Sequence, residues 1–335
     1  MDGPYPQKIM MQAVAVTDIH GNMRLYELLL RVADLWKLTS IFITGDLAPS
    51  ALQSPPERSA PITTEDQGVV IQRAFFTEQF IPLFSSFLLE HRHTDIYVIM
   101  GNDERRANEP LLATFDRETP NFHLMNDRLI ELRDSRQKQA FFPEEVPLLW
   151  VAGYPYVPPG GSLLMDWVKY ENRIKLRPEG MDPTTDIYEA GVTTDATGHG
   201  STIADDLEDF ESYLLKNSRT DREASYDPSR TIHLFHAPPY DTPLDWTTPR
   251  GRYDYLPLSD HVGSVEIRRF IMRTQPYLVL SGHCHESVVI GDYKADLGRT
   301  RCVNPGSQTH LDVLSLVQFD LYHPQEMKQF FIHAR

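Results

Sequence analysis

Cysteine is scarce in this sequence, which contains only Cys284 and Cys302 among its 335 residues. Two cysteines cannot build the disulfide framework of a small secreted protein, and their scarcity suits a reducing compartment. No apolar run approaches the roughly 20 residues that a membrane-spanning helix needs. The first residues also lack the basic and apolar regions of a signal peptide. The sequence therefore predicts a cytoplasmic protein without a membrane segment.

Basic residues are also few, since Lys and Arg number 32 against 47 Asp and Glu, and the formal net charge is −15. Such a chain repels polyanions at long range, which disfavours long nucleic acid as a partner. A small phosphate-bearing substrate stays compatible, because bound cations reverse the sign of the local field. The 41% of hydrophobic residues predicts a sizeable core. Nothing in the composition indicates the oligomeric state.

The most informative stretch is residues 16–22, Val-Thr-Asp-Ile-His-Gly-Asn. It follows an apolar run, 13–16, that predicts a buried strand, and it precedes a helical spacing of apolar residues. In an extended segment residues two apart point the same way, so we expect Asp18 and His20 to face one point while Ile19 faces the core. A carboxylate and an imidazole aimed together make half a metal site. Asp-x-His also occurs by chance, so this interpretation depends on partners further along the chain.

Beyond this stretch, short apolar runs alternate with helical patterns. We expect a helix from about 68 to 90, ended or kinked at Pro82, after a long surface loop over 49–67. A further helix is marked by Ile267, Phe270 and Ile271. Extended segments are expected at 41–44, 96–100, 148–153, 231–235, 277–280 and 287–290. The alternation predicts an α/β layered architecture.

Residues 155–230 interrupt this alternation after a start rich in proline and glycine. One amphipathic helix is indicated by the spacing of Ile203, Leu207, Phe210 and Leu214. We interpret the segment as an insertion or cap within a single domain that spans residues 1–335. Because it leaves the sheet after Gly153 and returns just before His236, we expect it to border the ligand-binding edge.

Seven polar side chains follow the predicted strands: Asp18, His20, Asp46, Asn102, His236, His283 and His285. In open α/β sheets, ligands bind at that edge. Nitrogen and hard oxygen ligands together suit Mn, Fe or Zn better than Ca or Mg. Seven ligands are too many for one tetrahedral ion, but they fit two ions if one carboxylate bridges, and such pairs stabilise an in-line displacement. These residues fall in five short motifs, and each motif alone can be explained by ordinary turn or strand-edge residues. All five coincidences would have to occur together, which favours the metal site.

The blocks Asp18-Ile19-His20, Gly45-Asp46, Gly101-Asn102-Asp103-Glu104, His236 and Gly282-His283-Cys284-His285 resemble, in identity and order, the motifs of the calcineurin-like metallophosphoesterases. The resemblance runs from about residue 12 to 320, except across 155–230. It implies an α/β fold of two mixed β-sheets packed as a sandwich with flanking helices. It also implies that one metal ion is held by Asp18, His20, Asp46 and His285. The other ion would be held by Asp46, Asn102, His236 and His283, so that Asp46 bridges.

The activity that this resemblance implies is hydrolysis of a small phosphate ester, either a diester or a monoester. Two transition-metal ions (Mn, Fe or Zn) would lower the pKa of bound water, so that a metal-bound hydroxide attacks phosphorus. One alternative is a nuclease or a nucleotide pyrophosphohydrolase with the same chemistry. Another is a non-catalytic scaffold that retains the fold, although loss of metal ligands would be expected there.

Asp103 departs from the family pattern, in which a histidine usually follows the Gly-Asn pair and assists the leaving group. If Asp103 acts in catalysis as an ionised carboxylate, it cannot donate a proton, and diesters or acidic leaving groups are favoured. Alternatively it holds a histidine ligand in place through a hydrogen bond. Arg252 is a candidate to clamp a substrate phosphate, although surface solvation is its ordinary explanation. Tyr240 is a candidate wall for a nucleoside or aryl group, and core packing explains it equally well.

Overall fold

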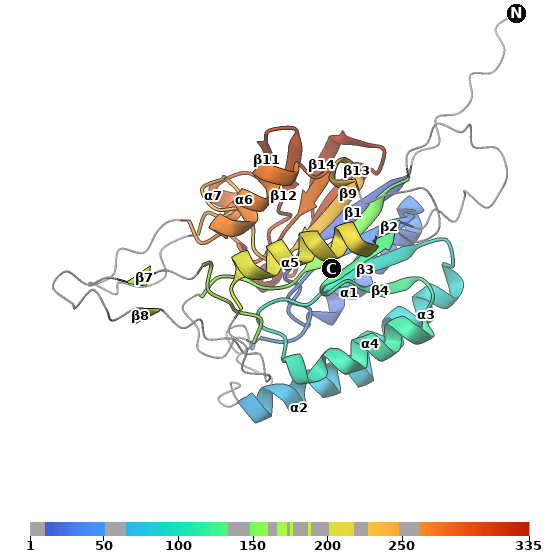
Figure 1. Cartoon of the computed structure of the whole chain (residues 1–335). Coiled ribbons are helices and arrows are strands. Elements are labelled where there is room, and N and C mark those ends of the chain that lie inside the picture. The colour runs from blue at the N-terminus through green and yellow to red at the C-terminus, as the bar shows by residue number, and fades with distance from the viewer. Residues whose placement is uncertain are drawn as a thin grey trace, which may run out of the picture.

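The computed structural model describes residues 11–50, 65–132, 148–159, 166–172, 175–176, 187–188, 201–217, 227–247 and 261–334. Two sheets of six strands pack face to face, and helices cover both outer faces (Figure 1). The α/β sandwich of two mixed sheets with flanking helices, which the sequence resemblance implied, is therefore confirmed. Among the described residues, no helix combines the length and apolar character that a membrane span requires.

The first sheet has the strand order β14-β13-β1-β2-β3-β4. Strands β1 to β4 run parallel, and β13 and β14 extend the sheet antiparallel beyond β1. The bounds are β1 Gln12–Val16, β2 Ser40–Thr44, β3 Asp95–Ile99, β4 Phe122–Leu124, β13 Val313–Asp320 and β14 His323–His333. The expected strands near 13–16, 41–44 and 96–100 are confirmed, whereas β4, β13 and β14 had not been predicted.

The second sheet has the order β11-β12-β10-β9-β6-β5 and is also mixed, with antiparallel strands at both edges. The bounds are β5 Arg128–Glu131, β6 Trp150–Tyr154, β9 Thr231–Phe235, β10 Leu278–Leu280, β11 Lys294–Leu297 and β12 Thr300–Val303. The strands predicted at 148–153, 231–235 and 277–280 correspond to β6, β9 and β10. A separate pair, β7 Lys175–Leu176 and β8 Ile187–Tyr188, lies within the predicted insertion.

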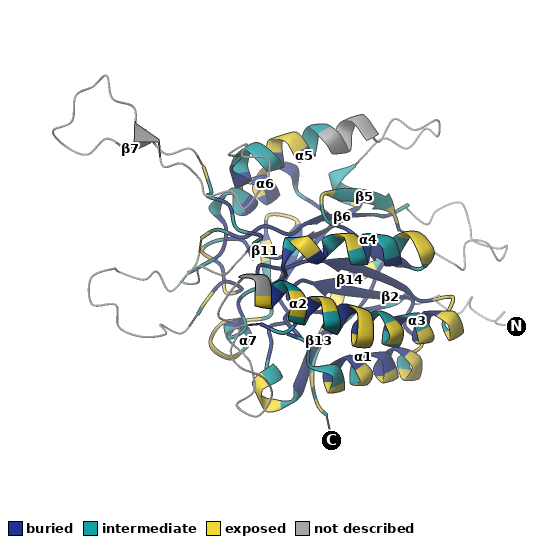
Figure 2. Ribbon diagram, turned by 90° about the horizontal axis from the view of Figure 1, so that it is seen from below, coloured by how far each residue is buried: buried dark blue, intermediate teal, exposed yellow. Residues whose placement is uncertain are grey.

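Helices α1 to α4 cover the first sheet, and α5 and α6 cover the second, each with a buried inner face and an exposed outer face (Figure 2). Their bounds are α1 Met23–Trp36, α2 Glu65–Phe75, α3 Ile81–Glu90, α4 Glu109–Glu118, α5 Ile203–Asn217 and α6 Val265–Thr274. The amphipathic helix expected in the insertion is α5, and its predicted spacing is confirmed. Shorter helical turns are η1 Phe76–Phe80, η2 Arg106–Asn108, η3 Pro228–Arg230 and η4 Thr309–Leu311.

The helix predicted over 68–90 is interrupted before Pro82, as expected. It begins earlier, at Glu65, and a π-helical turn (η1) separates α2 from α3. Pro82 sits in the first turn of α3, where its missing N–H costs little. Residues 51–64 of the predicted surface loop lie outside the described part of the chain.

One expected extended segment is wrong. Residues 287–290 form a short helix, α7 Ser287–Ile290, although their β-branched composition favours an extended chain. The Ser287 hydroxyl donates to the carbonyl of Cys284, and the N–H of Ile290 donates to the carbonyl of Glu286. These local hydrogen bonds, made while the chain turns out of the loop after β10, override the weak propensity of single residues.

Successive side chains point to opposite faces of each strand, and this alternation divides the core into layers. In β1, Ala13 and Ala15 face the second sheet, while Val14 and Val16 pack beneath the helices. The layer between the sheets also contains Phe42, Tyr97, Leu234 and Phe319. Both faces of β1 and β2 are therefore covered, so their close-packed side chains fix the points at which the following loops begin.

Candidate metal centre

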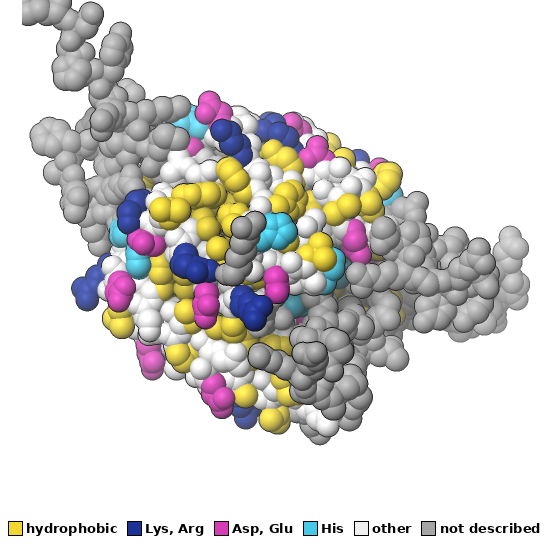
Figure 3. All heavy atoms as spheres, turned by 180° about the vertical axis from the view of Figure 1, so that it is seen from behind, with side chains coloured by type: hydrophobic (Ala, Val, Ile, Leu, Met, Phe, Trp, Pro, Cys, Tyr) yellow, Lys and Arg dark blue, Asp and Glu magenta, His cyan; other side chains and the backbone are white. Residues whose placement is uncertain are grey.

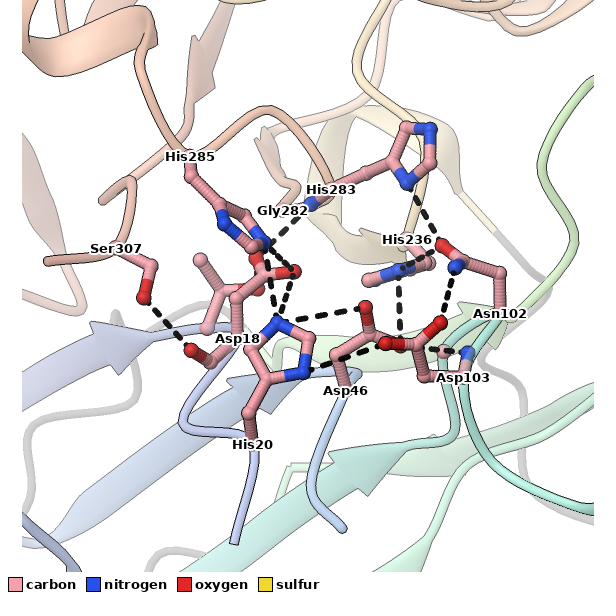
Figure 4. A network of polar contacts seen from close by, with 12 residues as sticks. Asp18, His20, Asp46, Asn102, Asp103, His236, Gly282, His283, His285 and Ser307 are labelled. Atoms are coloured by element: carbon pink, nitrogen blue, oxygen red, sulfur yellow. Dashed lines mark hydrogen bonds and ion pairs between the residues drawn. The ribbon is translucent and has the colours of Figure 1, made fainter. Parts of the chain in front are cut away.

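All seven polar side chains that the sequence placed after strands converge at one edge of the sandwich (Figure 4). They come from the ends of β1, β2 and β3 in the first sheet and of β9 and β10 in the second. The side chains are buried or nearly so: Asp18 and His236 are fully inaccessible, and Asp46 and Asn102 are at most 3% exposed. The sequence therefore predicted correctly which residues meet.

The reason given for the convergence of Asp18 and His20 is wrong. The segment is not extended, because Asp18 and His20 have φ values of 52° and 49° in the left-handed region. The N–H of Asp18 donates to Gly45 O and that of His20 to Asp46 O, so the turn is fixed against the next loop. Strain of this kind at non-glycine residues persists where the surroundings determine it, commonly at functional sites. Ile19 is buried in the core, as expected.

One half of the site comprises Asp18, His20, Asp46 and His285, which each offer one ligand atom within 4.8 Å of the others. His285 Nε2 lies 3.1 Å from Asp18 Oδ1. His20 Nε2 lies 3.1 Å from His285 Nε2 and 3.8 Å from Asp46 Oδ2. This grouping can bind a metal ion and equals the first ligand set implied by the resemblance.

The other half is centred on the amide oxygen of Asn102. This atom lies 2.9 Å from His236 Nε2 and 2.7 Å from His283 Nδ1. His236 Nε2 also lies 3.4 Å from Asp46 Oδ1. The two carboxylate oxygens of Asp46 therefore face different halves, Oδ1 toward His236 and Oδ2 toward His20.

The hydrogen-bonding pattern around His236 tests whether these residues suit a cation. Its Nδ1 lies 2.7 Å from Thr44 O, and a carbonyl only accepts, so Nδ1 carries the hydrogen. Asn102 Nδ2 donates to Asp103 Oδ1 at 3.1 Å, which turns the amide oxygen toward His236. In the neutral ring, the lone pair of Nε2 then faces the oxygens of Asn102 and Asp46. Three acceptors that converge need a cation between them or a proton on the ring, so the donor set fits a metal ion.

The charge balance of the site leads to the same conclusion. Burial alone would lower the pKa of His236, but the carboxylates of Asp46 and Asp18 raise it to about 10. Burial alone would raise the pKa of Asp46, yet the positive charge on His236 and His20 keeps it below its usual value. The pKa of His283 falls to about 4 because of burial and the neighbouring charge on His236. The buried carboxylates therefore stabilise positive charge at this site.

Two further residues shape the centre without having been given a role from the sequence. The Thr17 hydroxyl donates to Asp18 Oδ2 at 2.6 Å, as does the N–H of His283 at 3.0 Å, which leaves Asp18 Oδ1 for the centre. The buried Glu104 carboxylate accepts from Ala48 N at 2.8 Å and from Gly101 N at 2.6 Å. Glu104 therefore ties the loop after β2 to the loop after β3. The sequence feature that could have identified Glu104 as part of the site is its position in the Gly101–Glu104 motif.

The residues before Asn102 and His283 are glycines because the backbone there passes very close to side chains of the site. A Cβ atom on Gly101 would overlap the Asp46 side chain and lie 2.7 Å from His236 Nε2. A Cβ atom on Gly282 would overlap Thr17 and lie 2.8 Å from Asp18 Oδ2. These loops approach the opposing side chains so closely that only glycine fits.

Asp103 contacts His20, Asn102 and Asp46. Its Oδ2 is 3.4 Å from His20 Nδ1, its Oδ1 accepts from Asn102 Nδ2, and its N–H donates to Asp46 Oδ1 at 3.0 Å. His20 Nδ1 is buried and makes no hydrogen bond of ordinary length among the described residues. Burial and the charge of Asp46 raise the pKa of Asp103. The Asp103 carboxylate therefore faces Nδ1 of His20.

Of the two substrate-binding candidates, Tyr240 alone lies among the described residues. Tyr240 is partly buried, and its ring centroid lies 5.7 Å from that of His261, which also packs against the half-exposed Trp246. Arg252 lies outside the described residues. On the face shown in Figure 3, described Lys and Arg side chains lie among acidic and hydrophobic ones rather than in one continuous basic patch.

Comparison with known proteins supports the fold. No family model matches the chain, and no curated protein matches it by sequence. The protein TT1561 of Thermus thermophilus is 17% identical and aligns over 98% of this chain and 100% of its own, with a TM-score of 0.53. A second solved structure, 13% identical, covers the same shares with a TM-score of 0.58. A dimetal phosphatase from Danio rerio, 10% identical, aligns over 97% of this chain and 99% of its own, but its TM-score of 0.46 is below the level that indicates a shared fold.

Proposed function

We propose that this protein is a cytoplasmic phosphoesterase that uses two transition-metal ions to hydrolyse a small phosphate ester. The observation that carries the proposal is the position of Asp46. Its two oxygens face two separate groups of nitrogen and oxygen donors, 3.4 Å from His236 Nε2 and 3.8 Å from His20 Nε2. A carboxylate so placed is suited to bridge two cations.

The protein's own residues fix the geometry that this chemistry requires. Asp18, His20 and His285 would hold one ion, and Asn102, His236 and His283 the other. Two ions bound there would supply a nucleophile at neutral pH and stabilise the attacking and leaving oxygens of an in-line displacement. The hydrogen bond from His236 Nδ1 to Thr44 O fixes the tautomer that presents Nε2 to the centre. Thr17 similarly fixes which oxygen Asp18 presents.

Asp103 is proposed to position His20 rather than to protonate the leaving group. Its Oδ2 faces His20 Nδ1, and a carboxylate in contact with the outer nitrogen of a histidine ligand orients the ring and makes it a better ligand. Without a proton donor at this position, we expect diesters and esters with acidic leaving groups to react faster than alkyl monoesters. The negative charge of Asp103 would also repel a monoester dianion more than a diester monoanion.

A substrate panel with added Mn²⁺ tests the proposal. It should contain aryl monoesters and aryl diesters, cyclic nucleotides, dinucleotides and nucleoside triphosphates. We expect hydrolysis of diesters with acidic leaving groups, abolished by a chelator and restored by Mn²⁺. Cleavage confined to the anhydride bonds of nucleotides would favour a pyrophosphohydrolase instead. A protein that binds two ions but hydrolyses none of these compounds would be a scaffold, which contradicts the proposal.

A further inference from the structure

Residues 166–172, termed here the strap, connect the two sheets at the metal centre. They belong to the predicted insertion, and their roles were not anticipated from the sequence. The strap contacts the loop after β3, the residue Val157 after β6, and the N-terminus of α6. We propose that the strap, through Asp166 and Glu171, braces the half-site formed by Asn102, His236 and His283 and sets its affinity for metal.

One end of the strap is fixed to the loop that carries Asn102. The N–H of Asp166 donates to the Asn102 carbonyl at 3.2 Å. The Asp166 carboxylate accepts from Arg106 N at 2.8 Å and from Arg105 Nη1 at 3.3 Å. Arg105 is 3% exposed, so this ion pair is shielded from solvent on the cation's side. The backbone of a metal ligand is thereby held directly by the strap.

The other end is fixed to the second sheet through Glu171. Its carboxylate accepts from the Ser264 hydroxyl at 2.8 Å, from Val265 N at 2.7 Å and from Glu266 N at 3.2 Å. A carboxylate at the N-terminus of a helix is stabilised by the unpaired N–H groups and by the helix dipole. This contact also occupies the helix N-terminus with a side chain of the protein.

The fixed end of α6 is joined in turn to the loop that follows His236. Ser264 N donates to Pro238 O at 2.8 Å, and Tyr240 N donates to Ser264 O at 3.0 Å. The middle of the strap is held by two hydrogen bonds to Val157 and by the buried Trp167. A continuous path of hydrogen bonds therefore runs from Asn102, across the strap, to the loop after His236.

Both half-sites combine donors from the two sheets, but the path of hydrogen bonds joins the loops that carry Asn102 and His236, so it acts on their half-site. Asn102 comes from the first sheet, whereas His236 and His283 come from the second, so the donors keep their spacing only if the two sheets keep theirs. Asn102 contributes a neutral amide, while the other half-site has the carboxylate of Asp18 in addition to the shared Asp46. With one negative charge fewer, the Asn102 half-site is expected to bind a cation more weakly. Small displacements should therefore release its ion first.

The test is the stepwise binding of Mn²⁺ to the full-length protein, measured by calorimetry and by the electron paramagnetic resonance signal of free Mn²⁺. The variants are Asp166→Ala and Glu171→Ala, alone and combined. Asp166→Asn and Glu171→Gln are the conservative versions, which retain an acceptor oxygen if an alanine variant fails to fold. The matched control is Glu211→Ala, which removes an exposed ion pair, 2.8 Å long, between α5 and Arg273 of α6. Glu211 takes no part in the hydrogen bonds by which the start of α5 contacts the strap, those from Ile203 N to Tyr170 O and from Ala204 N to Glu171 O.

We expect both alanine variants to weaken the weaker binding step about tenfold, in the range seen for residues that support metal ligands, and to change the tighter step less than about twofold. In the double variant, the Mn²⁺ affinity of the weaker step should fall by less than the product of the two single fold-losses, because the two contacts act as one brace. The conservative variants should recover part of the affinity, and Glu211→Ala should match wild type.

Equal weakening of both steps, or a lower Tm with unchanged binding constants, would show a structural role only and overturn the inference. The inference rests on the proposed function, and the wild-type titration separates the two. Wild-type protein that never binds a second Mn²⁺ refutes the dinuclear proposal and the brace with it. Wild type that binds two, with variants that behave like Glu211→Ala, refutes the brace alone.

Discussion

Asp46→Asn is the substitution that most sharply tests the bridging carboxylate. The new side chain has nearly the same shape and keeps an oxygen, but it loses the negative charge shared by both halves of the site. Removing one partner of a buried charge pair costs about 3–5 kcal/mol. At 1.4 kcal/mol per factor of ten, metal affinity should fall by about two to three and a half orders of magnitude. Because Asp46 is 2% exposed, solvent cannot replace the lost interaction.

The assay is metal retention and activity after dialysis against a graded series of chelator concentrations. Asn102→Ala removes a neutral ligand from one half only, so the free energy of metal binding should weaken by less, about 1–3 kcal/mol. Asp95→Asn is the matched control, since Asp95 is also buried and contacts a histidine, His123 at 2.8 Å, but at the opposite end of β3. It should reduce stability and leave both ions bound. The reasoning is refuted if Asp46→Asn keeps both ions with wild-type affinity, or if it loses only one.

Two other predictions concern Asp103 and His233. Asp103→Asn should weaken metal binding about 10- to 100-fold and slow every substrate alike, so a changed dependence on leaving-group acidity across aryl esters would reject the positioning role. Burial lowers the pKa of His233 to about 3, so only the unfolded chain, with a pKa near 6.5, takes up its proton as the pH falls toward 5. Stability should then decline by about 2 kcal/mol between pH 7 and 5, and His233→Phe should remove this part of the decline. Urea unfolding of the two metal-free proteins measures the difference, and parallel pH profiles would contradict it.

The sequence predicted the convergence of the polar side chains better than it predicted the whole fold. Apolar strands followed by Asp46, Asn102 and His236 are local signals, and parallel strands bring their carboxyl ends to one edge whatever the loops do. The later strands β13 and β14 were missed because no functional residue follows them. The left-handed turn at Asp18 could not be read from sequence spacing, since hydrogen bonds to the loop after β2 impose it.

The contacts of the strap are a second feature that could not be predicted from the sequence. Asp166 and Glu171 lie in a segment without strong periodicity, and their partners are more than 50 residues away in the chain. Only the folded chain brings Asp166 to the loop after β3 and Glu171 to the N-terminus of α6. Glu104 is an intermediate case, because its motif was visible while its acceptor role between two loops was not.

The most direct test of the central claim is a titration of metal-free protein with Mn²⁺, in which hydrolysis of an aryl phosphodiester is followed against equivalents of metal per chain. We expect no hydrolysis without metal and a rate that rises until two equivalents are bound. Hydrolysis by metal-free protein, a rate that saturates at one equivalent, or no rate at any loading would contradict it.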